Sequence, residues 1–118
     1  MIVGAAVVEL HVHGSRSLKE KRGVVRSVTQ RVRNRFSVSV AEIGGQDTWT
    51  RVQLGISTVG SDALVVRRVL DQVIDFIEEL HLAELVAQDV EILRLPLHAE
   101  EDGEDGPDAD GDGPEEER

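Results

Sequence analysis

The chain has 118 residues, a length that suits one domain, and no stretch approaches the roughly 20 apolar residues that a membrane-spanning helix requires. It contains no cysteine, which excludes disulfides, thiol nucleophiles and cysteine-based zinc sites. The opening lacks the basic segment of a secretory signal, so we expect a cytoplasmic protein with no membrane partner.

The net charge of −10 is unevenly distributed along the chain. Residues 98–118 hold 11 acidic residues and one arginine, whereas residues 1–97 balance 12 acidic with 12 basic residues. Within residues 16–35, eight Lys or Arg face one Glu, a local charge of +7. We expect a folded domain over residues 1–97 and a disordered acidic tail over residues 98–118, whose apolar content is too low to offset the entropy of ordering.

Residues 2–13 alternate with period two and are rich in valine, which predicts a long strand. Glu9, His11 and His13 share one face of it, and ligands of these kinds bind zinc. Successive side chains on one face of a strand lie roughly 6.6 Å apart, so the three cannot easily converge on one ion. A metal site would need a ligand from another strand, and none is evident, so we expect exposed or interface histidines and no bound metal.

A helix is predicted from Ser17 to near Asn34. Ser17 and Glu20 have the spacing of a capping box, and apolar residues then recur at helical spacing. Lys21 projects close to this apolar stripe, and we expect its stem to pack and its ammonium to reach the edge. Basic residues gather on another face of the helix. With one residue that precedes the helix, they are the candidate nucleic-acid contacts: Arg16, Lys19, Arg22, Arg26 and Arg33.

The remaining elements complete a recognisable order. Residues 36–41 and 51–57 alternate and predict a strand hairpin, and an N-cap at residues 60–62 opens a second amphipathic helix that ends at Leu80. Residues 85–95 predict a fourth strand with less clean alternation. The order β-α-β-β-α-β predicts an α+β, ferredoxin-like (split β-α-β) fold, with a four-stranded antiparallel sheet and both helices on one face.

Several stretches resemble the YlxP-like family, short bacterial proteins of unknown function. They are Ser17-Leu18-Lys19-Glu20-Lys21-Arg22, Val25-Arg26-Ser27, Arg31-Val32-Arg33-Asn34-Arg35-Phe36, Val38-Ser39-Val40-Ala41-Glu42, Gln46-Asp47-Thr48-Trp49 and Leu54-Gly55. The resemblance implies a ferredoxin-like fold and a gene often found beside those for ribosome-binding factor A and translation initiation factor two. It implies no catalytic residues, and the acidic tail lies outside the family pattern.

The basic face of the first helix is the strongest functional feature. Four basic side chains on one face can contact several backbone phosphates, which gives salt-dependent, sequence-tolerant binding. The alternative is that acidic residues on the outside of the second helix pair with them. The start of the first helix is a second candidate, as a seat for one RNA phosphate, although the chain has no G-x-x-x-x-G-K-[ST] loop.

Catalysis has little support in the sequence. There is no G-x-S-x-G motif, and Glu42 and Asp47, which flank a turn, are more typical of a solvated loop than of a catalytic carboxylate pair. Trp49 is the only tryptophan and is expected near the open sheet face, as a loop anchor or part of a dimer contact. The first strand has no aromatic residue, so base stacking in the manner of an RNA-recognition motif is not expected.

These observations predict a non-enzymatic accessory protein of translation or ribosome assembly. It would need no cofactor and would contact ribosomal RNA, or a ribosomal particle, through the first helix. The alternative is a protein–protein interaction module that homodimerises through the open sheet face, where Val3, Ala5 and Val7 form an apolar patch. We further hypothesise that the acidic tail competes with RNA for the basic helix, against the simpler alternative of a solubility tail.

Overall fold

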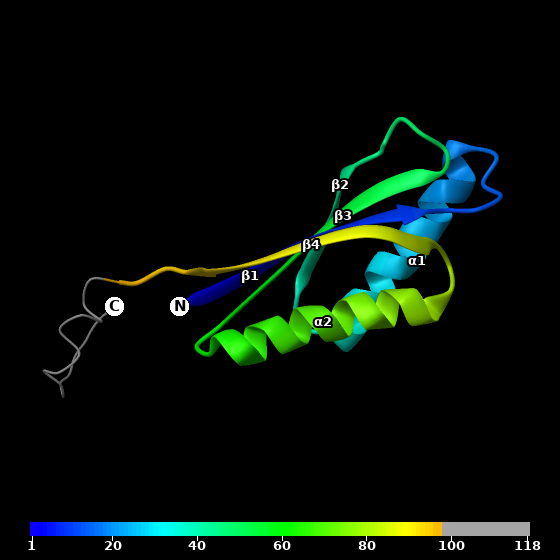
Figure 1. Cartoon of the computed structure of the whole chain (residues 1–118). Coiled ribbons are helices and arrows are strands. Elements are labelled where there is room, and N and C mark those ends of the chain that lie inside the picture. The colour runs from blue at the N-terminus through cyan, green and yellow to red at the C-terminus, as the bar shows by residue number, and fades with distance from the viewer. Residues whose placement is uncertain (98–118) are drawn as a thin grey trace, which may run out of the picture.

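The computed structural model describes residues 1–97, and the predicted tail lies outside the described residues. The elements, in order, are β1 (Ile2–His11), α1 (Leu18–Arg35), β2 (Ser39–Gly44), β3 (Arg51–Gly60), α2 (Ala63–Leu80) and β4 (Glu84–Arg94). The strands form one antiparallel sheet in the order β2-β3-β1-β4, and both helices lie along the same face of it (Figure 1). The predicted ferredoxin-like fold is confirmed.

The hydrophobic core lies between the sheet and the two helices. Alternate residues of β1, among them Val8 and Leu10, are fully buried against apolar residues of α1 and α2. Gly4 shows how closely α2 approaches the sheet, because a Cβ there would lie only 2.5 Å from the Cγ1 of Val66. Neither helix of residues 1–97 covers the other face of the sheet (Figure 1).

The helix boundaries follow local side-chain chemistry. The amide of Glu20 donates to the Ser17 hydroxyl at 3.1 Å, as the capping box predicts. The Glu20 carboxylate accepts from the Arg16 amide at 2.8 Å. In a capping box this carboxylate would accept from the amide of the N-cap residue, Ser17, so its partner here lies one residue earlier. The Asp62 side chain caps α2 by accepting from two backbone amides. Helix α1 ends at Arg35, one residue beyond the predicted end.

Two strands differ from the sequence prediction for identifiable reasons. β2 begins at Ser39 instead of residue 36, because Phe36 is the C-cap of α1. The irregular alternation of β4 comes from a bulge, since Glu9 pairs with Ala87 whereas Leu10 pairs with Leu85. The extra residue, Val86, switches the faces on which the side chains before and after it lie.

Candidate nucleic-acid interface

Three connections gather at one end of the sheet. The last residue of β1, His11, pairs with Arg51 at the start of β3 and with Glu84 at the start of β4. The β1–α1 loop, the β2–β3 hairpin and the α2–β4 loop therefore lie at this end, which we call the loop end (Figure 1). Helix α1 also begins here, so its first turns stand beside the hairpin.

Lys21 fastens the β2–β3 hairpin to the first turns of α1. Its side chain is 2% exposed, and its ammonium donates to the backbone carbonyls of Gly45 and of Arg51, the latter at 3.1 Å. The Glu42 carboxylate lies 4.0 Å from the same ammonium. The stem packs as predicted, but the ammonium is buried instead of reaching the edge, because the hairpin closes over it.

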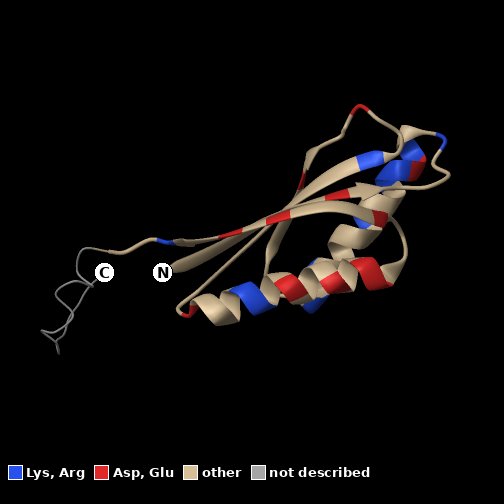
Figure 2. Ribbon diagram, viewed as in Figure 1, with Lys and Arg blue, Asp and Glu red and all other residues tan. Residues whose placement is uncertain are grey.

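The five predicted contact residues are all exposed on or beside α1. We call them the basic stripe: Arg16, Lys19, Arg22, Arg26 and Arg33. Figure 2 shows basic residues gathered at the start of α1 and acidic residues along α2 and the sheet. Within residues 1–97, the first four side chains of the stripe make no hydrogen bond or ion pair. Arg33 differs, because its guanidinium donates to the Val40 carbonyl at 2.6 Å.

Acidic residues of α2 do not occupy the basic stripe. Asp71 pairs with Arg67 of its own helix at 3.4 Å, and no ion pair joins α1 to α2 in the part of the chain that the structure describes. Arg35, outside the stripe, lies over the rings of Phe36 and Phe76 at 5.9 and 5.1 Å. The stripe is thus charged and accessible, whereas Arg35 is held against aromatic rings.

The start of α1 is less suited to a phosphate than its sequence indicates. The Glu20 carboxylate accepts from the Arg16 amide and places a negative charge at this helix end. The Glu20 amide is already used by the Ser17 hydroxyl. A phosphate at this position would meet the carboxylate, so the side chains of the basic stripe are better placed to contact RNA.

Trp49 lies in the hairpin that Lys21 holds against α1. Its side chain is 54% exposed, so it is not packed as a loop anchor within the described chain. Proteins that bind single-stranded nucleic acids combine exposed aromatic rings, on which bases stack, with basic side chains, which contact phosphates. The fold places this hairpin beside the first turns of α1, which the position of Trp49 in the sequence did not indicate.

The open sheet face divides into a polar and an apolar half. In the polar half, Glu9 pairs with Arg51 at 3.0 Å and accepts a longer hydrogen bond from Gln53. The apolar half contains a shallow depression between β1, β2 and β3, beside the exposed side chains of Val7 and Ile43. The residues that line the depression include Ala5, Val7, Ala41, Ile43 and Gly55.

The surroundings of the two histidines differ from those expected from the sequence. His11 and His13 converge with Glu84 of β4, whereas Glu9 is engaged by Arg51. A carboxylate from another strand, which was not evident in the sequence, therefore lies beside the two histidines. The predicted topology could have indicated this neighbour, because the end of β1 must lie beside the start of β4 in a split β-α-β sheet.

The chain belongs to the family described as "Protein of unknown function (DUF503)", which matches residues 3–90. It is 42% identical over 77 residues to the uncharacterized protein YlxP of Bacillus subtilis (strain 168), covering 65% of this chain and 84% of that protein. The resemblance to the YlxP-like family is thereby confirmed.

Two solved structures are similar to this chain at low sequence identity. The de novo designed protein Foldit4 is similar with a TM-score of 0.47 and 15% identity, over 81% of this chain and all of that one. SnoaB, a cofactor-independent oxygenase from Streptomyces nogalater, is similar with a TM-score of 0.45 and 12% identity, over 82% of this chain and 96% of that one.

Neither helix of residues 1–97 is apolar enough over its length to cross a membrane.

Proposed function

We propose that this protein is a non-enzymatic accessory factor of translation or ribosome assembly that contacts RNA phosphates through the basic stripe. The observation that carries the proposal is that Arg16, Lys19, Arg22 and Arg26 are exposed and make no hydrogen bond or ion pair within residues 1–97. Internal ion pairs would have offered a purely structural reason for these charges. The link to translation rests on the gene neighbourhood that the family resemblance implies.

The chemistry of the stripe favours phosphate over base contacts. Lys19 and Arg33 are 14 residues apart on α1, which is about 21 Å at 1.5 Å per residue. That length suits a run of several backbone phosphates, which carry the sequence-independent part of RNA affinity. Arg33 keeps further N–H donors beyond the one that bonds Val40. Trp49, in the neighbouring hairpin, can add stacking on an unpaired base.

Charge reversal tests the proposal. Four phosphate contacts predict a slope of log K against log salt of about −2.8 to −3.6, measured by fluorescence anisotropy with a ribosomal RNA fragment. The double variant Arg22→Glu/Arg26→Glu should lose most binding, because two attractive contacts become repulsive. Both side chains are exposed, so the fold should survive, which circular dichroism checks.

A matched control comes from the other helix. Arg67→Glu/Arg68→Glu makes the same change in charge at two exposed positions of α2. This variant should retain most of the binding, apart from the long-range effect of the added negative charge, which salt screens. Wild-type affinity in the α1 double variant, or equal losses in both variants, would show that the basic stripe is not the contact.

A second candidate function is homodimerisation through the open sheet face. It is favoured by exposed apolar side chains on that face, including Val7, Ile43, Val59 and Leu93. A second copy of the chain is the natural occupant, because two open sheets pack face to face about 10 Å apart with their apolar halves in contact. Such a dimer would leave the basic stripe accessible, since α1 lies on the opposite face (Figure 1).

A further inference from the structure

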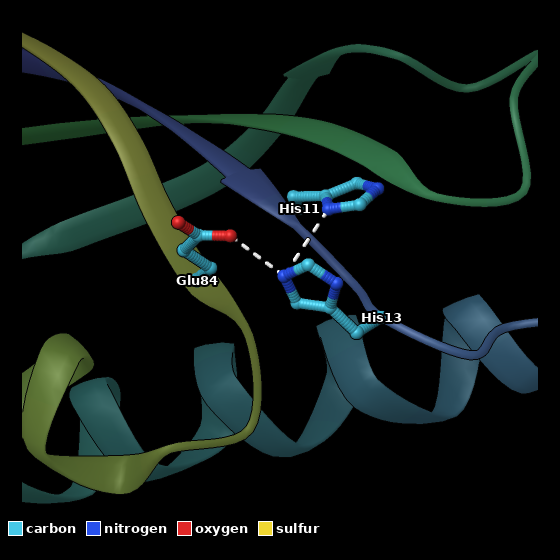
Figure 3. A group of neighbouring side chains, drawn as sticks. All are labelled: His11, His13 and Glu84. Atoms are coloured by element: carbon cyan, nitrogen blue, oxygen red, sulfur yellow. Dashed lines mark hydrogen bonds and ion pairs between the residues drawn. The ribbon is translucent and has the colours of Figure 1, made fainter.

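Three metal-ligand atoms converge at the loop end, outside the basic stripe. The Nδ1 of His11 lies 3.3 Å from the Nε2 of His13, which lies 2.6 Å from the Oε1 of Glu84 (Figure 3). One ligand atom from each residue lies within 4.8 Å of the other two. We call these residues the His–His–Glu cluster.

The local backbone explains why the cluster forms. The bulge at Val86 shifts the register by one residue, so that Glu84 instead of Leu85 stands opposite His11. Bulges re-aim side chains in this way and are frequent beside functional sites. His13 comes after the end of β1, where the chain turns at Gly14 with φ +78, so the spacing along an extended strand does not apply. Its ring meets that of His11 edge-on, with centroids 4.2 Å apart.

A single N–H on the His13 Nε2 can reach both of its contacts only as a weaker, bifurcated hydrogen bond. With Glu84 ionised, this nitrogen must carry the hydrogen that it donates to the carboxylate. It then has no lone pair with which to accept from the Nδ1 of His11, only 3.3 Å away. A divalent cation removes the conflict, because both nitrogens and the carboxylate then present lone pairs to one positive centre.

We propose that the His–His–Glu cluster is a binding site for a divalent transition metal, with Zn²⁺ as the best fit. Zinc–nitrogen bonds of about 2.0–2.1 Å in a tetrahedral site place two ligand atoms about 3.3 Å apart. The two ring nitrogens already have this separation. To reach the same separation from both nitrogens, the carboxylate must move less than about 1 Å away from His13, and to within about 3.3 Å of the His11 nitrogen, from which it now lies no more than 4.8 Å. The Glu84 side chain is 57% exposed, and its partner is His13, itself a member of the cluster, so the carboxylate has room to move.

The donor set selects among cations. Two imidazole nitrogens and one carboxylate suit zinc and similar metals, whereas Ca²⁺ and Mg²⁺ take oxygen ligands. Three protein ligands leave a fourth position for water, as in open zinc sites and unlike closed structural ones. His13 and Glu84 also line a surface hollow with Glu78 and His81 of the α2 end, so solvent reaches the site.

Zinc titration of the full-length protein by calorimetry tests the site. We expect one site per chain whose affinity falls at least about tenfold in His13→Ala and in Glu84→Gln, since even outer-shell partners of a metal contribute about 10–100-fold. The side chains of His13 and Glu84 are 66% and 57% exposed, so both variants should fold. Imidazole nitrogen signals of His11 and His13 should shift on zinc addition.

The control is Glu91→Gln, which removes an exposed carboxylate elsewhere on β4 and should leave zinc affinity unchanged. Zinc binding that survives both His13→Ala and Glu84→Gln would place the metal elsewhere, for example on the acidic residues 98–118, and would overturn the proposal. So would equal affinity for Mg²⁺, or no binding of micromolar zinc by the wild-type protein. These outcomes are independent of RNA binding, because no cluster residue belongs to the basic stripe.

Discussion

Replacing Lys21 by methionine tests how the hairpin is held against α1. Methionine keeps an unbranched apolar stem in the buried site but removes the ammonium, which donates to the carbonyls of Gly45 and Arg51. Each hydrogen bond to a charged group contributes about 1.5–3 kcal/mol. The change also leaves the Glu42 carboxylate without its cation, 4.0 Å away.

The expected loss of unfolding free energy is about 3 kcal/mol. It lies at the lower end of the sum of two such bonds, because the Lys21→Met change also removes the cost of burying an ammonium. In addition, the Glu42 side chain is 27% exposed and can recover water. For a domain of this size, about 3 kcal/mol corresponds to a fall in Tm of roughly 12–24 °C.

Urea and thermal unfolding measure this loss, and Lys19→Met is the matched control. Lys19 is exposed and makes no ion pair within the described chain, so its replacement should change stability by no more than about 0.5 kcal/mol. Trp49, in the same hairpin, reports local loosening by its fluorescence. A Lys21→Met protein as stable as the control would refute the conclusion that this ammonium fastens the hairpin.

Two further predictions concern association and the acidic tail. Light scattering at micromolar concentration should show a dimer that Val7→Glu separates, because the new charge would be buried between two apolar sheet faces; a strict wild-type monomer rules out this mode. Deleting residues 98–118, which carry the whole net charge of −10, should tighten RNA binding at low salt, with the gain shrinking as salt rises. Tail docking further requires that the deletion change the amide shifts of α1, and unchanged shifts would leave only long-range repulsion.

The sequence predicts the elements well because each carries a local signal. Period-two alternation marks β1 and β3, and short-range capping marks the start of both helices at Ser17 and Asp62. Their order then limits the fold to very few topologies. The irregular alternation in β4 also indicates a structural feature, because the alternation fails where Val86 forms the bulge.

Contacts between distant residues could not be predicted in the same way. Glu84 and His13 are 71 positions apart, and their contact depends on the bulge together with the turn after β1; the sequence marks the bulge but not the contact. The complete burial of Lys21 likewise depends on the closed hairpin, whose carbonyls satisfy its ammonium. The exposure of the basic stripe was predictable from helical spacing, but its lack of ion pairs within residues 1–97 depends on how α2 is oriented.

The most direct test of the proposed function is co-sedimentation of the full-length protein with ribosomal particles. At low salt the protein should sediment with the particles, and at high salt it should leave them, because counterions replace the basic stripe at the phosphates. Arg22→Glu/Arg26→Glu should stay in the supernatant at both salt concentrations. A wild-type protein that never sediments with the particles, or a double variant that sediments as the wild type does, would contradict the account.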